Sequence, residues 1–340
     1  MKKSILKIFG FIICIAMAFS MVACGETAND SSSNSQAQSS VTSATSENNS
    51  ANSSAGQSTV ISSSIEIKPI APSTTQTTIF MVGDSTVCEY TAAKEASRYY
   101  MRNGYGMRLG EYLTEYATIN NLALSGRSSK SFLAEANYQT LKTSIKAGDY
   151  LIIGFGHNDE KFAENRYTDP SLPTTEPTSF KYHLYEYYIK VAQQAGATPI
   201  LCTPIVRRSA GGSYSGSTIH QVTGNVTYNG GDYSKCIIEL GLEKGVDVID
   251  LTTLTKNYLT GKSISESAML YSWEKSSSST FDSATTTVDN THLNAYGAQI
   301  VAKMFVEELN TKTNNSLRGY IKAELPTPST DVLVPSSAVN

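Results

Sequence analysis

The chain has 340 residues, of which 40% are hydrophobic, and its 27 Lys and Arg against 30 Asp and Glu give a formal net charge of −3. The length allows one or two domains. A slightly acidic balance without a basic stripe argues against a nucleic-acid partner. The composition changes sharply after about seventy residues, so we consider the two parts separately.

The first 24 residues have the pattern of a secretory signal peptide. Three Lys precede an apolar run over residues 8–21, which is too short to span a bilayer comfortably. The segment 21–24 resembles the lipobox of bacterial lipoproteins, with Met21 where Leu is usual. That resemblance implies acylation of Cys24, and it predicts an extracellular protein held at the bacterial cell surface by a lipid anchor in the membrane. The alternative is an ordinary cleaved signal peptide with an incidental Cys.

The next segment is too polar to fold. Residues 25–64 contain no Lys, no Arg and no aromatic residue, and they consist largely of Ser, Asn, Thr, Ala and Gln. Such a segment buries too little apolar surface to offset the entropy lost on ordering it. We therefore expect a disordered tether over residues 25–75, a folded domain over 76–325 and a loose tail over 326–340, where Pro and Ser are frequent.

The folded part alternates between strand and helix patterns. Five short, mostly apolar runs fit strands that are buried on both faces of a parallel sheet: 78–82, 118–123, 150–155, 198–203 and 246–251. Helical patterns lie between and after them, over 105–116, 137–147, 180–195, 232–244 and 295–309. This alternation predicts a single α/β sandwich with right-handed crossovers. Residues 207–231 and 276–290 are expected to be surface loops.

Polar clusters follow three of the predicted strands, and a fourth precedes the last helix. In open α/β sheets, ligands bind in loops beyond the carboxyl ends of the strands. We therefore expect the four clusters to meet over one edge of the sheet. They are Gly83-Asp84-Ser85-Thr86, Ser125-Gly126-Arg127-Ser128, Gly156-His157-Asn158-Asp159 and Asp289-Asn290-Thr291-His292.

These clusters contain the groups that ester hydrolysis by a serine requires. A Ser hydroxyl such as that of Ser85 is a weak nucleophile until a base, here His292, removes its proton. The base needs a carboxylate, here Asp289, to fix its tautomer and stabilise the imidazolium. The backbone N–H groups of Ser85 and Gly126 and the side-chain amide of Asn158 are candidate donors to the oxyanion. Gly126 has no Cβ, so its amide can approach a substrate closely.

The four blocks, in this order, resemble those of the SGNH (GDSL) hydrolase family. Four stretches resemble in finer detail its rhamnogalacturonan acetylesterase branch: Gly83 to Thr86, Gly126 to Phe132, Thr203 to Arg208 and Asp289 to Leu293. The resemblance covers about residues 77–309. It implies a flavodoxin-like three-layer fold with a five-stranded parallel sheet, no metal and no organic cofactor. It also implies Ser85 as nucleophile, Asp289 and His292 as its partners, and Ser85, Gly126 and Asn158 as the oxyanion hole.

Other residues in these stretches have less certain roles. By the resemblance His157 supports its loop and is not the base, whereas Asp84 supports the nucleophile or acts only as a structural cap. Arg207 and Arg208 either pair with uronic-acid carboxylates, for which a planar bidentate donor is suited, or are solvated surface charges. The loop over 211–230 is richer in Gly, Ser and Thr than we expect for the branch, so its substrate contacts stay open.

The five Cys do not define a disulfide framework. Cys14 falls in the signal peptide and Cys24 is the candidate for acylation. The remaining three, Cys88, Cys202 and Cys236, allow at most one internal bridge, and pairing of Cys202 with Cys236 stays open. None of them has metal-ligand spacing.

We therefore expect a serine esterase that hydrolyses acetyl esters on plant cell-wall polysaccharide, with rhamnogalacturonan or pectin as substrate. A first alternative is another acyl substrate, such as acetyl-xylan, peptidoglycan or lipid, although no apolar insertion suggests a long acyl channel. A second is a metal-dependent phosphoesterase, which usually has an early Asp-x-His that this chain lacks. A third is a non-catalytic surface lipoprotein that binds polysaccharide, although every expected catalytic residue is present.

Overall fold

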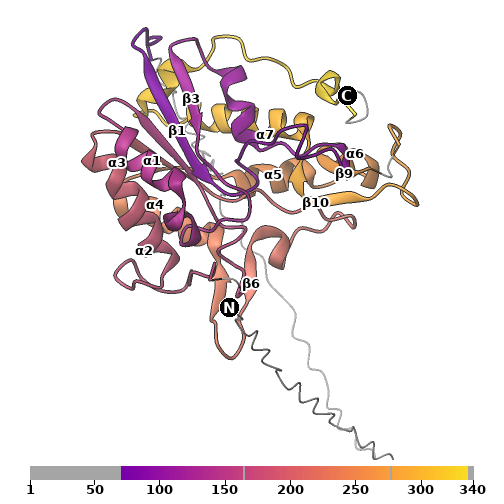
Figure 1. Ribbon diagram of the computed structural model, residues 1–340, viewed down its shortest axis with the longest axis horizontal. Helices are drawn as coiled ribbons and strands as arrows, with labels where there is room; N and C mark the ends of the chain where they lie inside the picture. Colours follow the sequence, from indigo (N-terminus) through magenta and orange to yellow (C-terminus); the bar gives the residue numbers. More distant parts are fainter. Residues whose placement is uncertain (1–69, 164, 276–277, 336–340) are drawn as a thin grey trace, which may run out of the picture. The chain divides into compact units, whose positions relative to one another are not determined.

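The computed structural model describes residues 70–163, 165–275 and 278–335 (Figure 1). The predicted signal peptide, Cys24 and nearly all of the predicted tether lie outside the described residues. Within these three ranges, no helix is long and apolar enough to cross a membrane.

The centre of the fold is a parallel sheet in the order β3-β1-β4-β5-β8. This is the strand order of a flavodoxin-like sheet. The five strands predicted from the sequence are confirmed, and their ends shift by no more than two residues. They are β1 (Thr77–Gly83), β3 (Ala117–Asn121), β4 (Tyr150–Gly154), β5 (Thr198–Cys202) and β8 (Asp247–Ile249).

Alternating side chains of β1 build a hydrophobic core on each face of the sheet. Ile79 and Met81 lie in one core, and Phe80 and Val82 lie in the other; each is at most 3% exposed. Helices cover both faces, so the domain has three layers (Figure 1). The helices packed on the core with Phe80 are α1 (Ala136–Ser144), α2 (Phe180–Leu184), α3 (Lys190–Gln194) and α4 (Tyr233–Lys244), and those on the other are α5 (Leu251–Leu259) and α7 (Ala295–Asn310).

The prediction of a helix over residues 105–116 is wrong. The segment forms two short 3₁₀ helices instead, Tyr105–Met107 and Leu109–Tyr112. The Tyr105 N–H donates to the carbonyl oxygen of Thr86 at 2.9 Å. A Cβ on Gly106 would lie 2.5 Å from the carbonyl oxygen of Val87, so glycine lets this segment pack directly against the turn that follows β1. Contact with that turn outweighs the weak helix propensity of a glycine-containing segment.

The predicted helix over residues 180–195 is present but not uniform. A π-helical turn, Tyr185–Ile189, joins α2 to α3. The other predicted helices, over 137–147, 232–244 and 295–309, correspond to α1, α4 and α7.

A small antiparallel sheet, not predicted from the sequence, lies beside the carboxyl edge of the parallel sheet. It has the order β10-β9-β2, with β2 (Arg98–Tyr100), β9 (Tyr271–Glu274) and β10 (Val288–Leu293). Residues 276–290 were expected to be a loop, but β10 begins at their end. The expected loop over 207–231 contains the hairpin of β6 (Gln221–Thr223) and β7 (Gly230–Asp232). The remaining short elements are α6 (Ile264–Ala268) and 3₁₀ turns at 131–134, 216–219, 316–320 and 330–332.

Residues at both predicted domain boundaries are held by the fold. The Ser73 N–H, in the last part of the predicted tether, donates to the carbonyl oxygen of Gly319 at 2.8 Å. In the tail that was expected to be loose, the Ser329 N–H donates to Gln299 Oε1 on α7 at 3.1 Å, and Pro335 forms an isolated bridge with Tyr100 of β2. The tail is therefore anchored as far as residue 335, because its backbone finds partners on α7 and β2.

The three Cys of the described ranges, Cys88, Cys202 and Cys236, are all free and buried. Burial raises the pKa of the Cys202 and Cys236 thiols to about 12. These side chains therefore pack as small apolar groups.

Candidate active site

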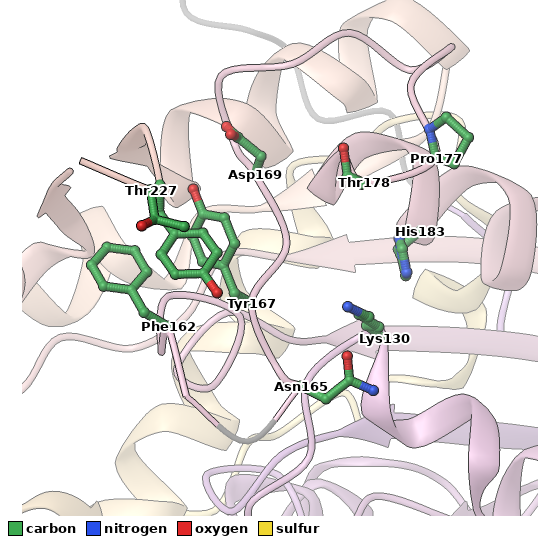
Figure 2. Close-up of a pocket in the computed structure, with 10 residues that line it drawn as sticks. Lys130, Phe162, Asn165, Tyr167, Asp169, Pro177, Thr178, His183 and Thr227 are labelled. Carbon is green, nitrogen blue, oxygen red and sulfur yellow. The ribbon is translucent and has the colours of Figure 1, made fainter. Parts of the chain in front are cut away.

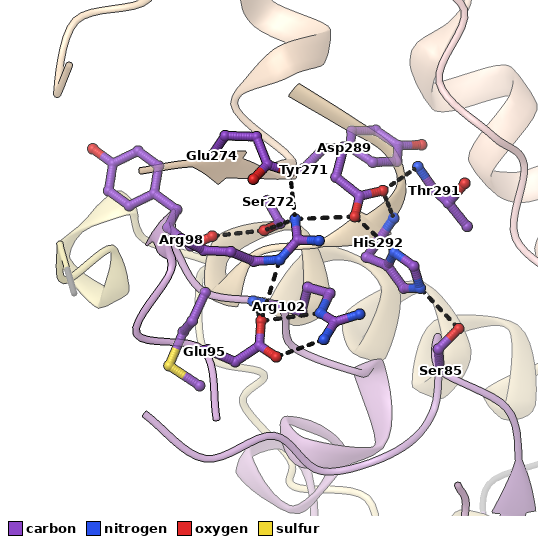
Figure 3. A network of polar contacts seen from close by, with 12 residues as sticks. Ser85, Glu95, Arg98, Arg102, Tyr271, Ser272, Glu274, Asp289, Thr291 and His292 are labelled. Carbon is purple, nitrogen blue, oxygen red and sulfur yellow. Dashed lines mark hydrogen bonds and ion pairs between the residues drawn. The ribbon is translucent and has the colours of Figure 1, made fainter. Parts of the chain in front are cut away.

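The two sheets bring together three side chains that are far apart in the sequence. Ser85 lies in the turn directly after β1, and Asp289 and His292 lie on β10. The Ser85 Oγ is 2.9 Å from His292 Nε2, and His292 Nδ1 is 2.8 Å from Asp289 Oδ2 (Figure 3). This linear arrangement allows His292 to accept the serine proton while its other nitrogen donates to the carboxylate.

Local hydrogen bonds fix the position of Asp289. Its Oδ1 accepts the backbone N–H groups of Thr291, at 2.9 Å, and of His292, at 3.0 Å. Burial raises the pKa of the Asp289 carboxyl, but the hydrogen bond and charge of His292 and these two backbone donors outweigh it and hold the pKa below its ordinary value. Asp289 is therefore an anion oriented towards the imidazole.

Hydrogen bonds of the Asn294 side chain hold the segment after His292 in place. Its side-chain oxygen accepts the Gly297 N–H at 2.9 Å and caps the N-terminus of α7. Its amide nitrogen donates to the carbonyl oxygens of Met269 and Tyr271, both at 2.8 Å. His292 is thus held between a strand and a capped helix.

Arg98 on β2 is a member of the site that had no sequence signal. Its Nη1 lies 3.1 Å from Asp289 Oδ2, the same oxygen that faces His292 (Figure 3). The guanidinium group also contacts the carboxylates of Glu274, at 3.4 Å, and Glu95, at 3.5 Å, and donates to Ser272 Oγ at 3.1 Å. Only the antiparallel pairing of β2 with β9 places Arg98 here.

The same contacts continue back to the nucleophile. Glu95 accepts two hydrogen bonds from the guanidinium group of Arg102, at 2.7 and 3.0 Å, and this group lies 4.7 Å from the ring centre of Tyr90. The Tyr90 hydroxyl donates to the carbonyl oxygen of Ser85 at 2.8 Å. Burial raises the pKa of this phenol, so it stays a donor. The network therefore restrains both ends of the triad.

Besides the N–H of Ser85, the candidate oxyanion donors are Gly126 and Asn158, which lie on two adjoining loops. Gly126 has φ = +77°, a conformation that glycine adopts without strain, and a Cβ there would meet nothing within 4 Å. Asn158 is 3% exposed, and its Nδ2 donates to the carbonyl oxygen of Arg127 at 3.1 Å. This contact uses one of its two N–H groups and ties Asn158 to the residue after Gly126. Arg166 Nη1 donates to Asn158 Oδ1 at 3.1 Å and fixes the amide orientation.

Asp84 and His157 are buried beside these groups. Asp84 Oδ1 accepts the backbone N–H and the hydroxyl of Thr86, at 2.9 and 2.8 Å, and burial raises its pKa. This contact shapes the turn that carries Ser85.

The imidazole of His157 is held neutral by its surroundings. Burial lowers the pKa of His157 well below its usual range, helped by the charges of His220 and Arg207. The ring of His157 packs edge-on against His220, with 4.4 Å between centroids, and neither nitrogen has a hydrogen-bond partner in the described residues.

The structure places both candidate substrate arginines in internal contacts. Arg208 is 7% exposed and donates to Ser267 Oγ, Asn290 Oδ1 and the carbonyl oxygen of Ile264, at 2.9 to 3.0 Å. Arg207 pairs with Glu160 and donates to the carbonyl oxygen of Ser217. This geometry favours a structural role for both over pairing with a uronate. In the part of the chain that the structure describes, no group of three or more His, Cys, Asp and Glu side chains is arranged to hold a metal ion.

Comparison with known proteins agrees with this geometry. Residues 79–305 match the family model described as GDSL-like lipase/acylhydrolase. Rhamnogalacturonan acetylesterase RhgT of Bacillus subtilis (strain 168) is 29% identical over 230 residues, which cover 67% of this chain and 88% of that protein. YesY of the same strain, described as a probable rhamnogalacturonan acetylesterase, is 32% identical over 185 residues, covering 54% of this chain and 74% of YesY. The crystal structure of YxiM from Bacillus subtilis has a TM-score of 0.50 and 25% identity, over 71% of this chain and 58% of YxiM.

Proposed function

We propose that this chain, which belongs to the GDSL-like lipase/acylhydrolase family and is a carboxylic ester hydrolase, removes acetyl groups from plant cell-wall polysaccharide, with rhamnogalacturonan as substrate. The observation that carries the reaction is the hydrogen-bonded series Ser85, His292 and Asp289. The substrate is supported by the names of the two relatives, RhgT and YesY.

In the first half of the proposed reaction, the Ser85 Oγ attacks the acetyl carbonyl carbon while its proton passes to His292 Nε2. Asp289 stabilises the imidazolium that forms and itself stays ionised, because its pKa is held low. The carbonyl electron pair moves to the oxygen, which in this proposal accepts hydrogen bonds from the N–H groups of Ser85, Gly126 and Asn158. The bond to the sugar oxygen then breaks, and the sugar hydroxyl leaves with the proton from His292.

In the second half, His292 takes a proton from water, and the hydroxide adds to the acetyl carbonyl of the acyl-enzyme. Collapse of this intermediate releases acetate and returns the proton to Ser85 Oγ. Each oxyanion donor is worth about 2.7–4 kcal/mol by analogy with measured cases.

A cavity next to the turn that carries Ser85, where the hydroxyl of its lining residue Tyr90 bonds the Ser85 carbonyl oxygen, favours a sugar over a fatty acyl chain. It has a volume of about 360 Å³ and is lined by Tyr90, Ser125 and six charged side chains, among them Arg102 and Arg127. A long alkyl chain gains nothing from such a lining, whereas sugar hydroxyls find donors and acceptors there. This observation supports acetyl-polysaccharide over lipid as substrate.

We also propose that the protein is secreted and held at the bacterial surface by a lipid on Cys24, a proposal supported by the sequence pattern alone. Expression in a bacterium fed an alkyne fatty acid tests it. Label is expected on the wild type and not on Cys24→Ser, and label on neither protein would refute the anchor.

The experiment that tests the enzymatic function measures acetate released from acetylated rhamnogalacturonan, beside acetyl-xylan and a small aryl acetate. Wild-type protein is expected to release acetate fastest from rhamnogalacturonan, and Ser85→Ala, checked for folding by circular dichroism, is expected to release none above background. Faster release from acetyl-xylan would move the substrate assignment to xylan. Equal release by both proteins would refute the serine mechanism.

A further inference from the structure

A second cavity, separate from the one beside the nucleophile, has a volume of about 360 Å³. Figure 2 shows it, with Lys130, Asn165 and His183 on one side and Phe162, Tyr167 and Thr227 on the other. Neither the triad nor the oxyanion donors line it. None of the reaction steps above uses it.

One wall of this cavity is an aromatic platform made of Phe162, Tyr167 and Tyr228. The Phe162 and Tyr228 rings are stacked, 4.8 Å apart and 8° from parallel, and Tyr167 tilts against Tyr228 at 4.5 Å. Tyr228 comes from the β6–β7 hairpin and the other two from the loop after β4. A pyranose has a face of C–H bonds that packs on an aromatic ring, and each ring of the stacked pair has one face that the other ring does not cover, so this wall suits a sugar.

The facing wall supplies one available positive charge. The Lys130 ammonium group is half-buried and has no hydrogen-bond or ion-pair partner among the described residues. His183 is buried, and burial together with the charge of Lys130 lowers its pKa to about 4, so it is neutral near pH 7. The cavity's carboxylate, Asp169, already accepts hydrogen bonds from Ser171 and Asn229, at 2.6 to 2.9 Å.

The cavity is built on the same two loops as the oxyanion site. Lys130 is four residues after Gly126, and Asn165 lies next to Arg166, which orients the Asn158 amide. Asn158 bonds to both loops through Arg127 and Arg166. A polymer bound at the nucleophile therefore passes over the loops that form this cavity.

We propose that this cavity binds a uronate residue of the polysaccharide, with its carboxylate on Lys130 and its ring on the platform of Phe162 and Tyr228. This inference rests on the proposed function and names the group that makes the enzyme select an acidic polymer. It assigns to Lys130 the role that the sequence had suggested for Arg207 and Arg208.

Binding to the Ser85→Ala protein tests the site without turnover. The probes are oligogalacturonate and the same oligomer methyl-esterified, which has the same rings without the charge, and titration calorimetry measures both affinities. Ser85→Ala is expected to prefer the free acid by about 10-fold, the lower range for a hydrogen bond to a charged group. Adding Lys130→Met should abolish that preference, whereas adding Phe162→Ala should weaken both probes alike.

Lys161→Met is the matched control, because Lys161 is an exposed Lys on the neighbouring loop outside the cavity. It should leave the preference for the free acid in place. Equal loss in both Lys variants would mean that general attraction of a polyanion is responsible, and an unchanged preference in Lys130→Met would overturn the site. Acetate release from rhamnogalacturonan is scored separately, so activity without the Lys130 effect refutes only the cavity proposal, and absence of activity refutes the function.

Discussion

The guanidinium group of Arg98 and the imidazole of His292 share one oxygen, Oδ2 of Asp289, at 3.1 and 2.8 Å (Figure 3). The carboxylate is therefore held from two sides. Glu95 and Glu274 also face Arg98, so one cation separates three acidic groups. Removing it takes away the cation that the three carboxylates share, although Glu95 keeps Arg102 and Asp289 keeps His292, so the repulsion among them rises in a partly buried setting.

Replacing Arg98 is expected to slow catalysis without changing substrate binding. In Arg98→Gln the Asp289 carboxylate loses one of the contacts that orient it, and small displacements of catalytic groups reduce rates by about 10- to 100-fold. We expect kcat to fall by about this amount and KM to stay constant. Arg98→Lys should recover only part of the loss, because a single ammonium group cannot reproduce the planar fork. Equal kcat in wild type and Arg98→Gln would contradict the role.

Ser85 and His292 are expected to act as a unit. Each single alanine variant should lower kcat on an aryl acetate by more than about 10⁴-fold, and the double variant should lower it no further, because neither group works without the other. Kinetics on all three variants, together with their melting temperatures, checks this. A double variant whose loss is the product of the two single losses would show that they act independently.

Asn158 is expected to contribute through its amide N–H. Asn158→Ala should lower kcat by about 10²- to 10³-fold, the range measured for loss of one oxyanion donor. Arg166→Met keeps that donor and removes one contact that orients it, so a loss below about 10-fold is expected. The comparison of kcat between the two variants is the test. Similar losses in both would assign the effect to loop structure.

Asp159 is expected to make the fold less stable as the pH rises. Burial raises its pKa to about 7, although hydrogen bonds from Ser129 and Thr168 oppose this. Between the ordinary value of 3.8 and about 7 the folded state therefore holds a proton that the unfolded chain has lost, so stability declines as the pH rises through this window.

The Asp159→Asn variant removes this titration. Urea unfolding at pH 4, 5.5 and 7 should show the free energy of unfolding of wild type falling, relative to Asp159→Asn, by more than about 1 kcal/mol over the range. The comparison cancels other titrating groups and any constant cost of the substitution. A difference that is independent of pH would show that Asp159 is ionised throughout.

The parallel sheet and the triad could be predicted because their signals are local. Each strand is a short apolar run followed by a polar turn, and Ser85, Asn158 and His292 lie in those turns or just before the last helix. The sheet alone does not show that His292 reaches Ser85. That contact depends on β10. The sequence pattern did not predict this strand, because its residues form the end of a polar segment that was expected to be a loop.

Arg98 and Lys130 were missed for different reasons. Arg98 lies in a three-residue strand whose partner, β9, is more than 170 residues away, so no periodicity marks it. Lys130 was visible in the sequence as part of a family block, but its importance depends on a cavity that combines three separate segments. For Arg208 the error is the opposite one. We expected an exposed side chain, but it is buried and contacts Ser267 and Asn290.

Ser85 and His292 are 207 positions apart in the sequence, and this separation determines when the active site forms during folding. The pairing of β10 with β9 and its approach to β1 join distant segments, and such contacts form late during folding. A nascent chain whose β10 segment is still inside the ribosome therefore has the nucleophile Ser85 without its base, His292. Esterase activity should return after the helical signal during refolding, so this enzyme is inactive until β10 has been made and paired.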